Sequence, residues 1–163
     1  MKNGWQPRKL HDVCEIIMGT SPPGDTYNTV GEGLPLINGP VEFSSGSFGR
    51  TARTKFTTAP NKLCKENELI LCVRGSTTGK MNIAGSVACI GRGVAAIRAK
   101  EYQPWINYFI RSKRDDISVL SHHKLNNTNW LGQQVFSFCE IFDVSACWIG
   151  TFSKSEMLRI CKI

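Results

Sequence analysis

ELILCVRGSTTGKMNIAGSVACIGRGVAAIRA, residues 68–99, is the stretch that decides the fold of this chain. It holds three short apolar runs, Leu69–Val73, Val87–Ile90 and Val94–Ile97, which are rich in β-branched and small residues and have glycine near their ends. This pattern predicts three strands. Gly91-Arg92-Gly93 separates the last two runs and predicts a three-residue hairpin loop. The polar segment 74–82, with a glycine near each end, predicts the other loop.

These two loops would carry positive side chains and hydroxyl groups on a small, rigid sheet. Such side chains suit a phosphate-rich partner, because cations and hydroxyls are common phosphate contacts in proteins. The structural alternative for Arg92 is that its guanidinium binds nearby carbonyl groups and holds the hairpin. The candidate contact residues of the two loops are Arg74, Ser76, Thr77, Thr78, Lys80 and Arg92.

The composition favours a single domain with an anionic partner. The 163 residues are 41% hydrophobic, enough to bury a core, and 20 Lys and Arg against 13 Asp and Glu give a net charge of +7. This charge suggests nucleic acid first and acidic lipid second, with a basic protein lacking either partner as the alternative. With no signal peptide and no apolar run near the ~20 residues of a membrane span, we expect a cytoplasmic protein without a membrane partner.

The seven cysteines predict reduced thiols rather than disulfides or a metal site. They are odd in number, include no Cys-x-x-Cys pair, and in part lie within apolar runs, as Cys14, Cys72 and Cys89 do. Buried thiols in a reducing compartment have this distribution. We therefore expect neither a bound metal nor a cofactor.

The first 60 residues supply a second group of candidate contacts. Thr20–Asn28 is an ordered loop stiffened by two prolines, and Tyr27 and Asn28 at its end could reach a base edge or stack on a base. Packing of Tyr27 onto the core is the alternative. Segment 44–60 is basic and hydroxyl-rich without periodicity, so it either follows a phosphate backbone or is a solvated excursion. Its candidate contacts are Arg50, Arg53 and Lys55, with Phe48 and Phe56 as candidate anchors.

Three further segments have recognisable patterns. Trp5–Met18 fits either a two-turn helix that feeds a strand or the strand itself, and Leu34–Ile37 predicts a short strand. Tyr102–Ile110 predicts a helix with Pro104 in its first turn.

The patterns of known catalytic sites fail on spacing. Gly75–Lys80 follows a predicted strand as a P-loop does, but three residues instead of four separate its glycines, and Met81 follows the lysine. Gly91-x-Gly93 joins two strand-like runs and opens no helix, which excludes a dinucleotide fingerprint. No nucleophile has a recognisable base and orienting group, so we expect no enzymatic activity.

Four segments of the chain, in this order, resemble one family. They are residues 5–28 (W-x4-L-x2-VCEII-x-G-x-SPPG-x2-YN), 33–39 (GLP-x-I-x-G), 69–74 (L-x3-VR) and 82–97 (NIA, then CIGRG-x-AAI). Each is weak alone, whereas their order and spacing together are specific. The stretch from Trp5 to Leu120 resembles the target-recognition domain of type I restriction–modification specificity (S) subunits.

The resemblance implies an α+β fold with a small, strongly curved, mostly antiparallel β-sheet and short helices. It implies a non-catalytic, sequence-specific reader of double-stranded DNA. In that family the S subunit directs methyltransferase subunits, and through them restriction subunits, to a target site. An S subunit of the family carries two such domains separated by long helices, and each domain reads half of a split site.

The resemblance ends near residue 120. The loop, the proline-ended strand and the spacer helix that the family would place next are not recognisable. We therefore expect a DNA target-recognition domain at residues 1–120 and a divergent or truncated tail at residues 121–163. The alternative function is a protein-interaction module that docks on a methyltransferase or another S subunit without productive DNA binding.

Overall fold

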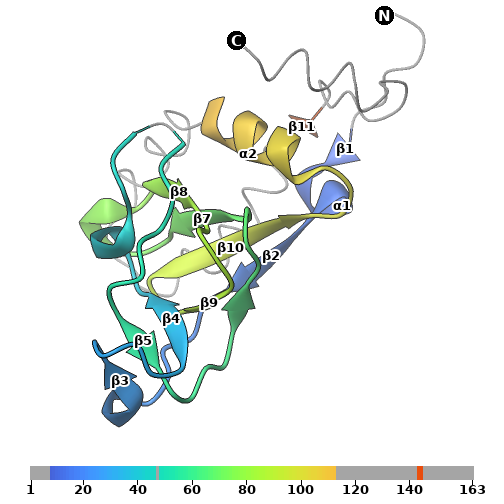
Figure 1. Ribbon diagram of the computed structural model, residues 1–163. Helices are drawn as coiled ribbons and strands as arrows, with labels where there is room; N and C mark the ends of the chain where they lie inside the picture. Colours follow the sequence, from blue (N-terminus) through green and yellow to red (C-terminus); the bar gives the residue numbers. More distant parts are fainter. Residues whose placement is uncertain (1–7, 47, 113–142, 145–163) are drawn as a thin grey trace, which may run out of the picture.

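Two strands that are apolar on both faces form the centre of the fold. The structure is a computed structural model and describes residues 8–46, 48–112 and 143–144. Strands β7 (Leu69–Cys72) and β10 (Val94–Ala99) pair antiparallel. Strand β2 (Cys14–Met18) adds to the other edge of β10, and β8 (Met81–Ile83) to the other edge of β7. The result is an antiparallel sheet in the order β2-β10-β7-β8 (Figure 1).

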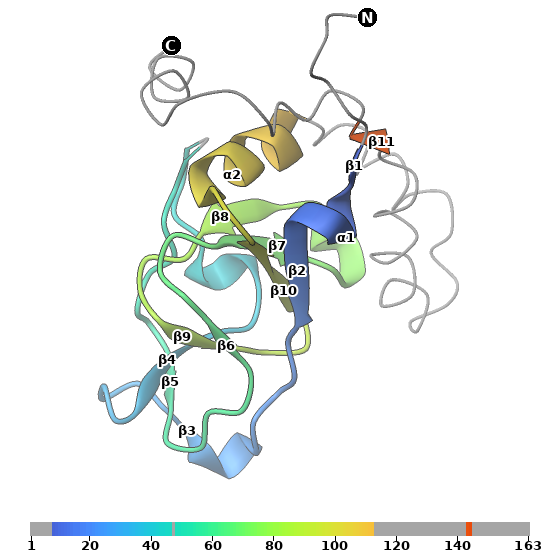
Figure 2. The ribbon, with the colours of Figure 1, turned by 90° about the vertical axis from the view of Figure 1, so that its right-hand side faces the viewer.

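A second sheet of shorter strands lies at the end of the molecule opposite helix α2 (Figures 1 and 2). Its order is β3-β5-β4-β9-β6, and within it β4 and β9 run parallel while the other neighbours run antiparallel. The strands are β3 (Tyr27–Asn28), β4 (Leu34–Ile37), β5 (Phe56–Thr57), β6 (Leu63–Cys64) and β9 (Ala88–Ile90).

Helix α2 (Gln103–Ser112) covers the face of the four-stranded sheet that points away from the second sheet (Figure 2). Its amphipathic pattern explains this, because Ile106 and Ile110, one turn apart, are both buried against the sheet. The other helical segments of the described residues are single turns. They are α1 (Leu10–Val13), η1 (Gly24–Thr26), η2 (Pro40–Glu42) and η3 (Gly75–Thr77), and a separate two-stranded pair joins β1 (Arg8–Lys9) to β11 (Asp143–Val144).

The alternation of side chains along β7 and β10 divides the core into two clusters. Leu69 and Leu71 face α2, whereas Ile70 and Cys72, between and after them, face the second sheet. In the same way Ile97 belongs to the first cluster and Val94 to the second. Successive side chains of a strand point to opposite faces, so a strand that is buried on both faces needs a continuous apolar run. This is why the runs in residues 69–73 and 94–97 lack polar residues.

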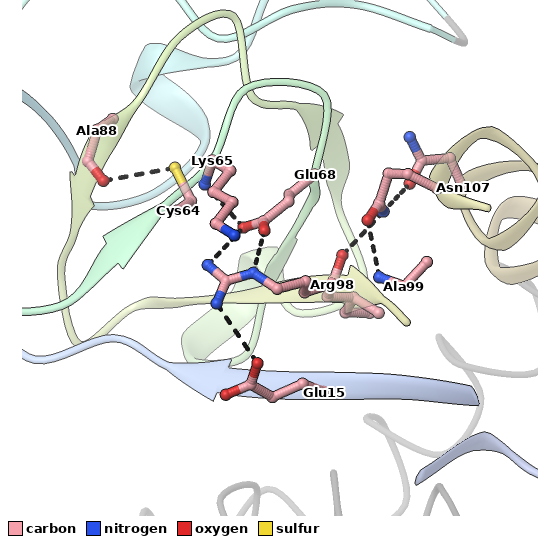
Figure 3. A network of polar contacts seen from close by, with 10 residues as sticks. Glu15, Cys64, Lys65, Glu68, Ala88, Arg98, Ala99 and Asn107 are labelled. Carbon is pink, nitrogen blue, oxygen red and sulfur yellow. Dashed lines mark hydrogen bonds and ion pairs between the residues drawn. The ribbon is translucent and has the colours of Figure 1, made fainter. Parts of the chain in front are cut away.

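A network of polar contacts ties the start of β7 to β2, β10 and α2 (Figure 3). Arg98 donates to the carboxylate of Glu68 and forms an ion pair with Glu15 at 3.4 Å. The Glu68 side chain is 3% exposed and also accepts a hydrogen bond of 2.8 Å from the Lys65 backbone N–H. Asn107 of α2 donates to the carbonyl of Asn67 at 2.9 Å. The buried acid is therefore fully partnered.

The predicted hairpin at Gly91–Gly93 is wrong. Strands β9 and β10 do not pair with each other, because β9 lies in the five-stranded sheet and β10 in the four-stranded sheet. The Gly91 N–H donates to the Ile37 carbonyl of β4, and the Val73 N–H donates to the Gly93 carbonyl. The three residues thus form a corner where the chain passes from one sheet to the other.

The other predicted elements are mostly confirmed. The fold class is α+β with mainly antiparallel strands, and the strands at 69–73, 87–90, 94–97 and 34–37 and the helix at 102–110 are present with small shifts at their ends. Within segment 5–18, the described residues include a one-turn helix, Leu10–Val13, that feeds strand Cys14–Met18, so the helix is one turn shorter than in the first alternative. The predicted loop 74–82 ends earlier, because β8 begins at Met81. The strands β5 and β6 are not predicted by the sequence, and the predicted loop Thr20–Asn28 contains the single turn η1 and ends in strand β3.

Four cysteines lie in the described part of the chain, and all four are buried free thiols, as expected: Cys14, Cys64, Cys72 and Cys89. The predicted tail at 121–163 lies outside the described residues except for Asp143–Val144. Within the described ranges, no helix combines the length and the apolar character that crossing a bilayer requires.

Candidate nucleic-acid interface

The ends of three strands of the four-stranded sheet bring the first group of predicted contacts together. Val94 is opposite Cys72 in the β10–β7 register, and the Val73 N–H donates to the Gly93 carbonyl at 3.0 Å, so Arg74 and Arg92 each lie one residue beyond the last bond between these strands. On the other edge, Gly19 donates to the Val94 carbonyl at 3.0 Å, and Ser21 Oγ accepts a hydrogen bond of 3.5 Å from the Arg92 N–H. Two arginines that are far apart in the chain therefore leave the same end of one sheet.

Close backbone approach at this corner explains its glycines. A Cβ atom on Gly93 would lie 2.3 Å from the Asn38 carbonyl oxygen, and one on Gly19 would lie 2.2 Å from the Gly91 carbonyl oxygen. Real Cβ atoms do not tolerate such distances, so the strand ends could not meet with larger residues here. The glycines of the sequence thus mark where the chain changes direction, but they do not show that it passes to the other sheet instead of forming a hairpin.

The β7–β8 loop presents Arg74 and Lys80 on opposite sides of a tight turn. The Gly79 N–H donates to the Cys72 carbonyl at 3.0 Å, and the Cys72 N–H donates to the Lys80 carbonyl at 2.9 Å. Both cations are exposed, and neither forms an ion pair within the described residues. An exposed cation without an acidic partner remains available to a phosphate.

The loop hydroxyls have a partly structural role. Thr78 Oγ1 donates to the Gly75 carbonyl at 2.8 Å, and Thr77 Oγ1 donates to the Arg74 carbonyl at 3.4 Å. Ser76 is exposed at the tip. Beneath the loop, burial raises the pKa of the Cys72 thiol to about 11, against smaller opposite effects of the Thr77 hydrogen bond and the Lys80 charge. Cys72 is thus a protonated core residue and not a nucleophile.

Arg92 is exposed at the corner, and its guanidinium makes no hydrogen bond or ion pair within the described residues. The structural alternative, in which the guanidinium binds carbonyl groups and holds the turn, has no such contact to support it. The turn is held instead by backbone bonds, including the one from Val94 to the Gly91 carbonyl at 3.1 Å.

The second group lies on the five-stranded sheet, where β3 pairs with β5. Lys55 Nζ lies 5.9 Å from the centre of the Tyr27 ring, and the Tyr27 hydroxyl donates to the Pro22 carbonyl at 3.2 Å. Asn28 Oδ1 accepts from the Gly31 and Glu32 N–H groups at 3.2 and 3.0 Å. These contacts favour the packing alternative for Tyr27 and give Asn28 a role in its own turn. Arg53, nearby in sequence, is exposed and has no ion pair in the described ranges.

Arg50 is separate from both groups. Its backbone forms an isolated β-bridge with Ile83, the last residue of β8, whereas Lys80 precedes the first residue of that strand. The Arg50 side chain lies 3.7 Å from the Glu66 carboxylate and donates to Asn67 Oδ1 at 2.7 Å. Its charge is therefore partly neutralised by a neighbouring acid. A role for Arg50 alongside Arg53 and Lys55 remains a prediction that this arrangement does not favour.

A groove that the sequence does not predict opens beside Lys80. It has a volume of about 760 Å³ and lies between the segment around η2, strand β8 and the end of α2. Phe48 and Tyr108 are 56% and 50% exposed, and both line it. Tyr108 lies off the apolar stripe of α2 and one turn before Arg111, which is the sequence signal that could have identified this surface.

Comparisons with known proteins agree with this architecture. A family model described as type I restriction modification DNA specificity domain matches residues 2–133, most of the chain. This chain belongs to that family. It is 35% identical over 96 residues to a putative type I restriction enzyme specificity subunit of Methanocaldococcus jannaschii, and the match covers 59% of this chain and 21% of the relative.

Solved structures share the fold of this specificity-domain chain. The HsdS subunit from Thermoanaerobacter tengcongensis is 26% identical with a TM-score of 0.66, over 98% of this chain and 43% of that one. The S subunit from M. genitalium, at 17% identity and a TM-score of 0.53 over 74% and 30% of the two chains, supports the fold alone. The chain thus spans about a fifth of the curated relative and less than half of each solved one. Within its described residues, no group of three or more His, Cys, Asp and Glu could hold a metal ion.

Proposed function

We propose that this chain is a non-catalytic DNA target-recognition domain of a type I restriction–modification specificity subunit. The observation that carries the proposal is the corner where Arg74, Lys80 and Arg92 are exposed without acidic partners in the described part of the chain. Cations on loops at one end of a rigid sheet can bind the phosphates on either side of a groove, and the loop side chains between them can reach base edges.

The partners follow from the family. Double-stranded DNA is the ligand, methyltransferase subunits bind the specificity subunit, and restriction subunits join through them. A solved chain 26% identical to this one, with a TM-score of 0.66, comes from work on complex assembly of a type I restriction–modification system, which supports this set of partners. Such a complex would act in the cytoplasm, where the cell's DNA is accessible, and this chain would need no cofactor of its own.

The test is the salt dependence of duplex binding. A mobility-shift or selection assay on random duplex DNA, with and without a methyltransferase partner, first establishes binding. We expect Arg74→Ala and Lys80→Ala to weaken it and to reduce the salt slope by ~0.9 per lost phosphate contact. Lys65→Ala is the matched control, because Lys65 is exposed at the other end of β7.

The outcomes distinguish the proposal from the protein-interaction alternative. If both variants keep the wild-type affinity and slope, these residues do not touch phosphate and the proposed interface is wrong. If the chain is captured by a methyltransferase subunit but shifts no duplex under any condition, it is a docking module and not a DNA reader.

A further inference from the structure

The groove beside Lys80 has two flat aromatic side chains on its walls. The rings of Phe48 and Tyr108 have centroids 6.5 Å apart, and their planes differ by 13°. Each is half exposed or more, although apolar side chains of this size are usually covered. The Arg111 guanidinium lies 4.9 Å from the centre of the Phe48 ring and extends this flat surface.

The groove is lined by cationic and hydroxyl-bearing side chains. Lys80 and Arg111 both line it, and no Asp or Glu is among the described residues that do so. Lys80 has no ion pair within the described ranges, so its charge is available to an incoming anion. The lining hydroxyls belong to Ser44, Ser45 and Ser112.

The wall of the groove also contains an unsatisfied acceptor. Asn82 is 1% exposed and lines the groove, and its Nδ2 donates to the Ser44 carbonyl at 3.0 Å. Its Oδ1 has no hydrogen-bond partner in the described structure. A buried carbonyl oxygen without a donor costs free energy, so a ligand that carries N–H groups would gain by supplying one.

We propose that this groove binds a single unpaired nucleotide. The base stacks against Tyr108 and Phe48, and the phosphate faces Lys80. Base–aromatic stacking with a cation at the phosphate is the general means by which proteins hold unpaired nucleotides. A protein segment would also cover the aromatic rings, but a nucleotide combines in one small molecule a flat ring for Tyr108 and Phe48, an anion for Lys80 and N–H groups for Asn82 Oδ1.

The nucleotide can come from two sources. Lys80 belongs both to the groove and to the loop that carries Arg74, so an unpaired nucleotide in DNA bound at the corner could reach the aromatic rings. A free mononucleotide presents the same base and phosphate. The inference goes beyond the proposed function, which concerns a base-paired duplex and does not require the groove.

The experiment uses the full chain and two fluorescent probes, 2-aminopurine 5′-monophosphate and a DNA duplex with one unpaired 2-aminopurine. Stacking quenches this base, so we expect saturable quenching by the wild-type chain with at least one probe. Removal of a stacking aromatic weakens binding about 5- to 150-fold, which we expect for Tyr108→Ala and Phe48→Ala. Tyr108→Phe keeps the ring and should bind within about twofold of wild type.

Val30→Ala is the control for loss of an exposed apolar side chain, since Val30 is 78% exposed and outside the groove. Unfolding temperatures check that each variant is folded. Quenching with the free nucleotide or with the unpaired base in DNA each supports the site and identifies its source. The proposal is overturned if the chain quenches neither probe or if folded Tyr108→Ala binds as wild type does. It is also overturned if the chain quenches a paired 2-aminopurine inside a perfect duplex equally well. Failure of the groove leaves the salt-slope test of Arg74 unaffected, so the two proposals fail separately.

Discussion

Replacing Arg98 with methionine tests whether the polar network of Figure 3 holds the two-sided sheet together. Methionine keeps the length of the apolar stem and removes the guanidinium. In the wild type, Arg98 donates to both carboxylate oxygens of Glu68, through Nε and, at 3.5 Å, through Nη2. In the variant the Glu68 carboxylate keeps one hydrogen-bond donor among the described residues, the Lys65 backbone N–H at 2.8 Å.

The expected loss follows from the burial of the two partners. Breaking a buried ion pair by removing one partner costs about 3–5 kcal/mol, because the remaining charge is desolvated and unpaired. The Glu68 side chain is 3% exposed, but that of Arg98 is 26% exposed, so water can partly replace the guanidinium. We therefore expect Arg98→Met to lower the free energy of unfolding by about 2–4 kcal/mol. A chain of this size would then melt about 5–15 °C lower.

The assay is urea unfolding followed by tryptophan fluorescence or circular dichroism, read as a double-mutant cycle. Glu68→Gln removes the buried charge and keeps an acceptor for the Lys65 N–H. We expect Arg98→Met/Glu68→Gln to be more stable than Arg98→Met alone, because no unpaired charge remains buried. Glu15→Gln is the exposed control: the Glu15 side chain is 58% exposed, and its loss should cost less than about 1 kcal/mol.

Two results would refute this account of the network. The first is an Arg98→Met variant within about 0.5 kcal/mol of wild type, the usual range for a surface substitution. The second is a double variant that loses the sum of the two single losses, which would mean that Arg98 and Glu68 do not act through each other.

Two further predictions concern the corner and the core. Gly93→Ala should destabilise the fold by about 1–3 kcal/mol in chemical unfolding, because its Cβ would lie 2.3 Å from the Asn38 carbonyl oxygen. Gly24→Ala is the control and should be close to neutral, because a Cβ there has nothing within 4 Å. Equal stabilities of the two variants would contradict the close approach at Gly93. Burial raises the pKa of Cys64 and Cys72 from 9.0 to about 11, so at pH 8 their thiolate fractions are ~100-fold lower than in the unfolded chain. Iodoacetamide should therefore label both thiols slowly until urea is added, which mass spectrometry would show. Between pH 9 and 11 the unfolded chain loses thiol protons that the folded chain keeps. The free energy of unfolding should therefore be unaffected by these thiols below pH 9 and fall between pH 9 and 11 by ~1.4 kcal/mol per pH unit for each thiol. A flat profile there would contradict burial of the thiols.

The sequence predicts those elements whose burial is encoded locally. Leu69–Cys72 and Val94–Ala99 are found from their continuous apolar runs, and α2 from its stripe and its proline. Strands β5 (Phe56–Thr57) and β6 (Leu63–Cys64) have two residues each, too few to show a period. Their pairing depends on β4 and β9, which are distant in the chain, so only the folded structure reveals them.

The candidate site is predictable to the same extent. Cations near glycine are visible in the sequence, and Arg74, Lys80 and Arg92 are indeed exposed. What the sequence does not contain is which cations have acidic neighbours. Arg50 meets Glu66 and Arg98 meets Glu68 only after strands from different parts of the chain pair. The groove is hidden for the same reason, because Phe48, Lys80 and Tyr108 come from three separate segments.

The error at Gly91–Gly93 shows how the two sheets create the surface. A hairpin would place Arg92 at its tip, beyond the sheet and bonded only to its own strands. In the corner, the Gly91 N–H instead donates to the Ile37 carbonyl of the other sheet at 2.8 Å, and the Val73 N–H donates to the Gly93 carbonyl at 3.0 Å, so Arg92 lies between backbone bonds to both sheets. Arg74 and Arg92 are thus each held by backbone bonds of the adjoining strands, one residue beyond the last bond between β7 and β10. Inserting one glycine after Gly91 should therefore shift Arg92 relative to Arg74 without removing either charge, and should weaken duplex binding in a mobility-shift assay.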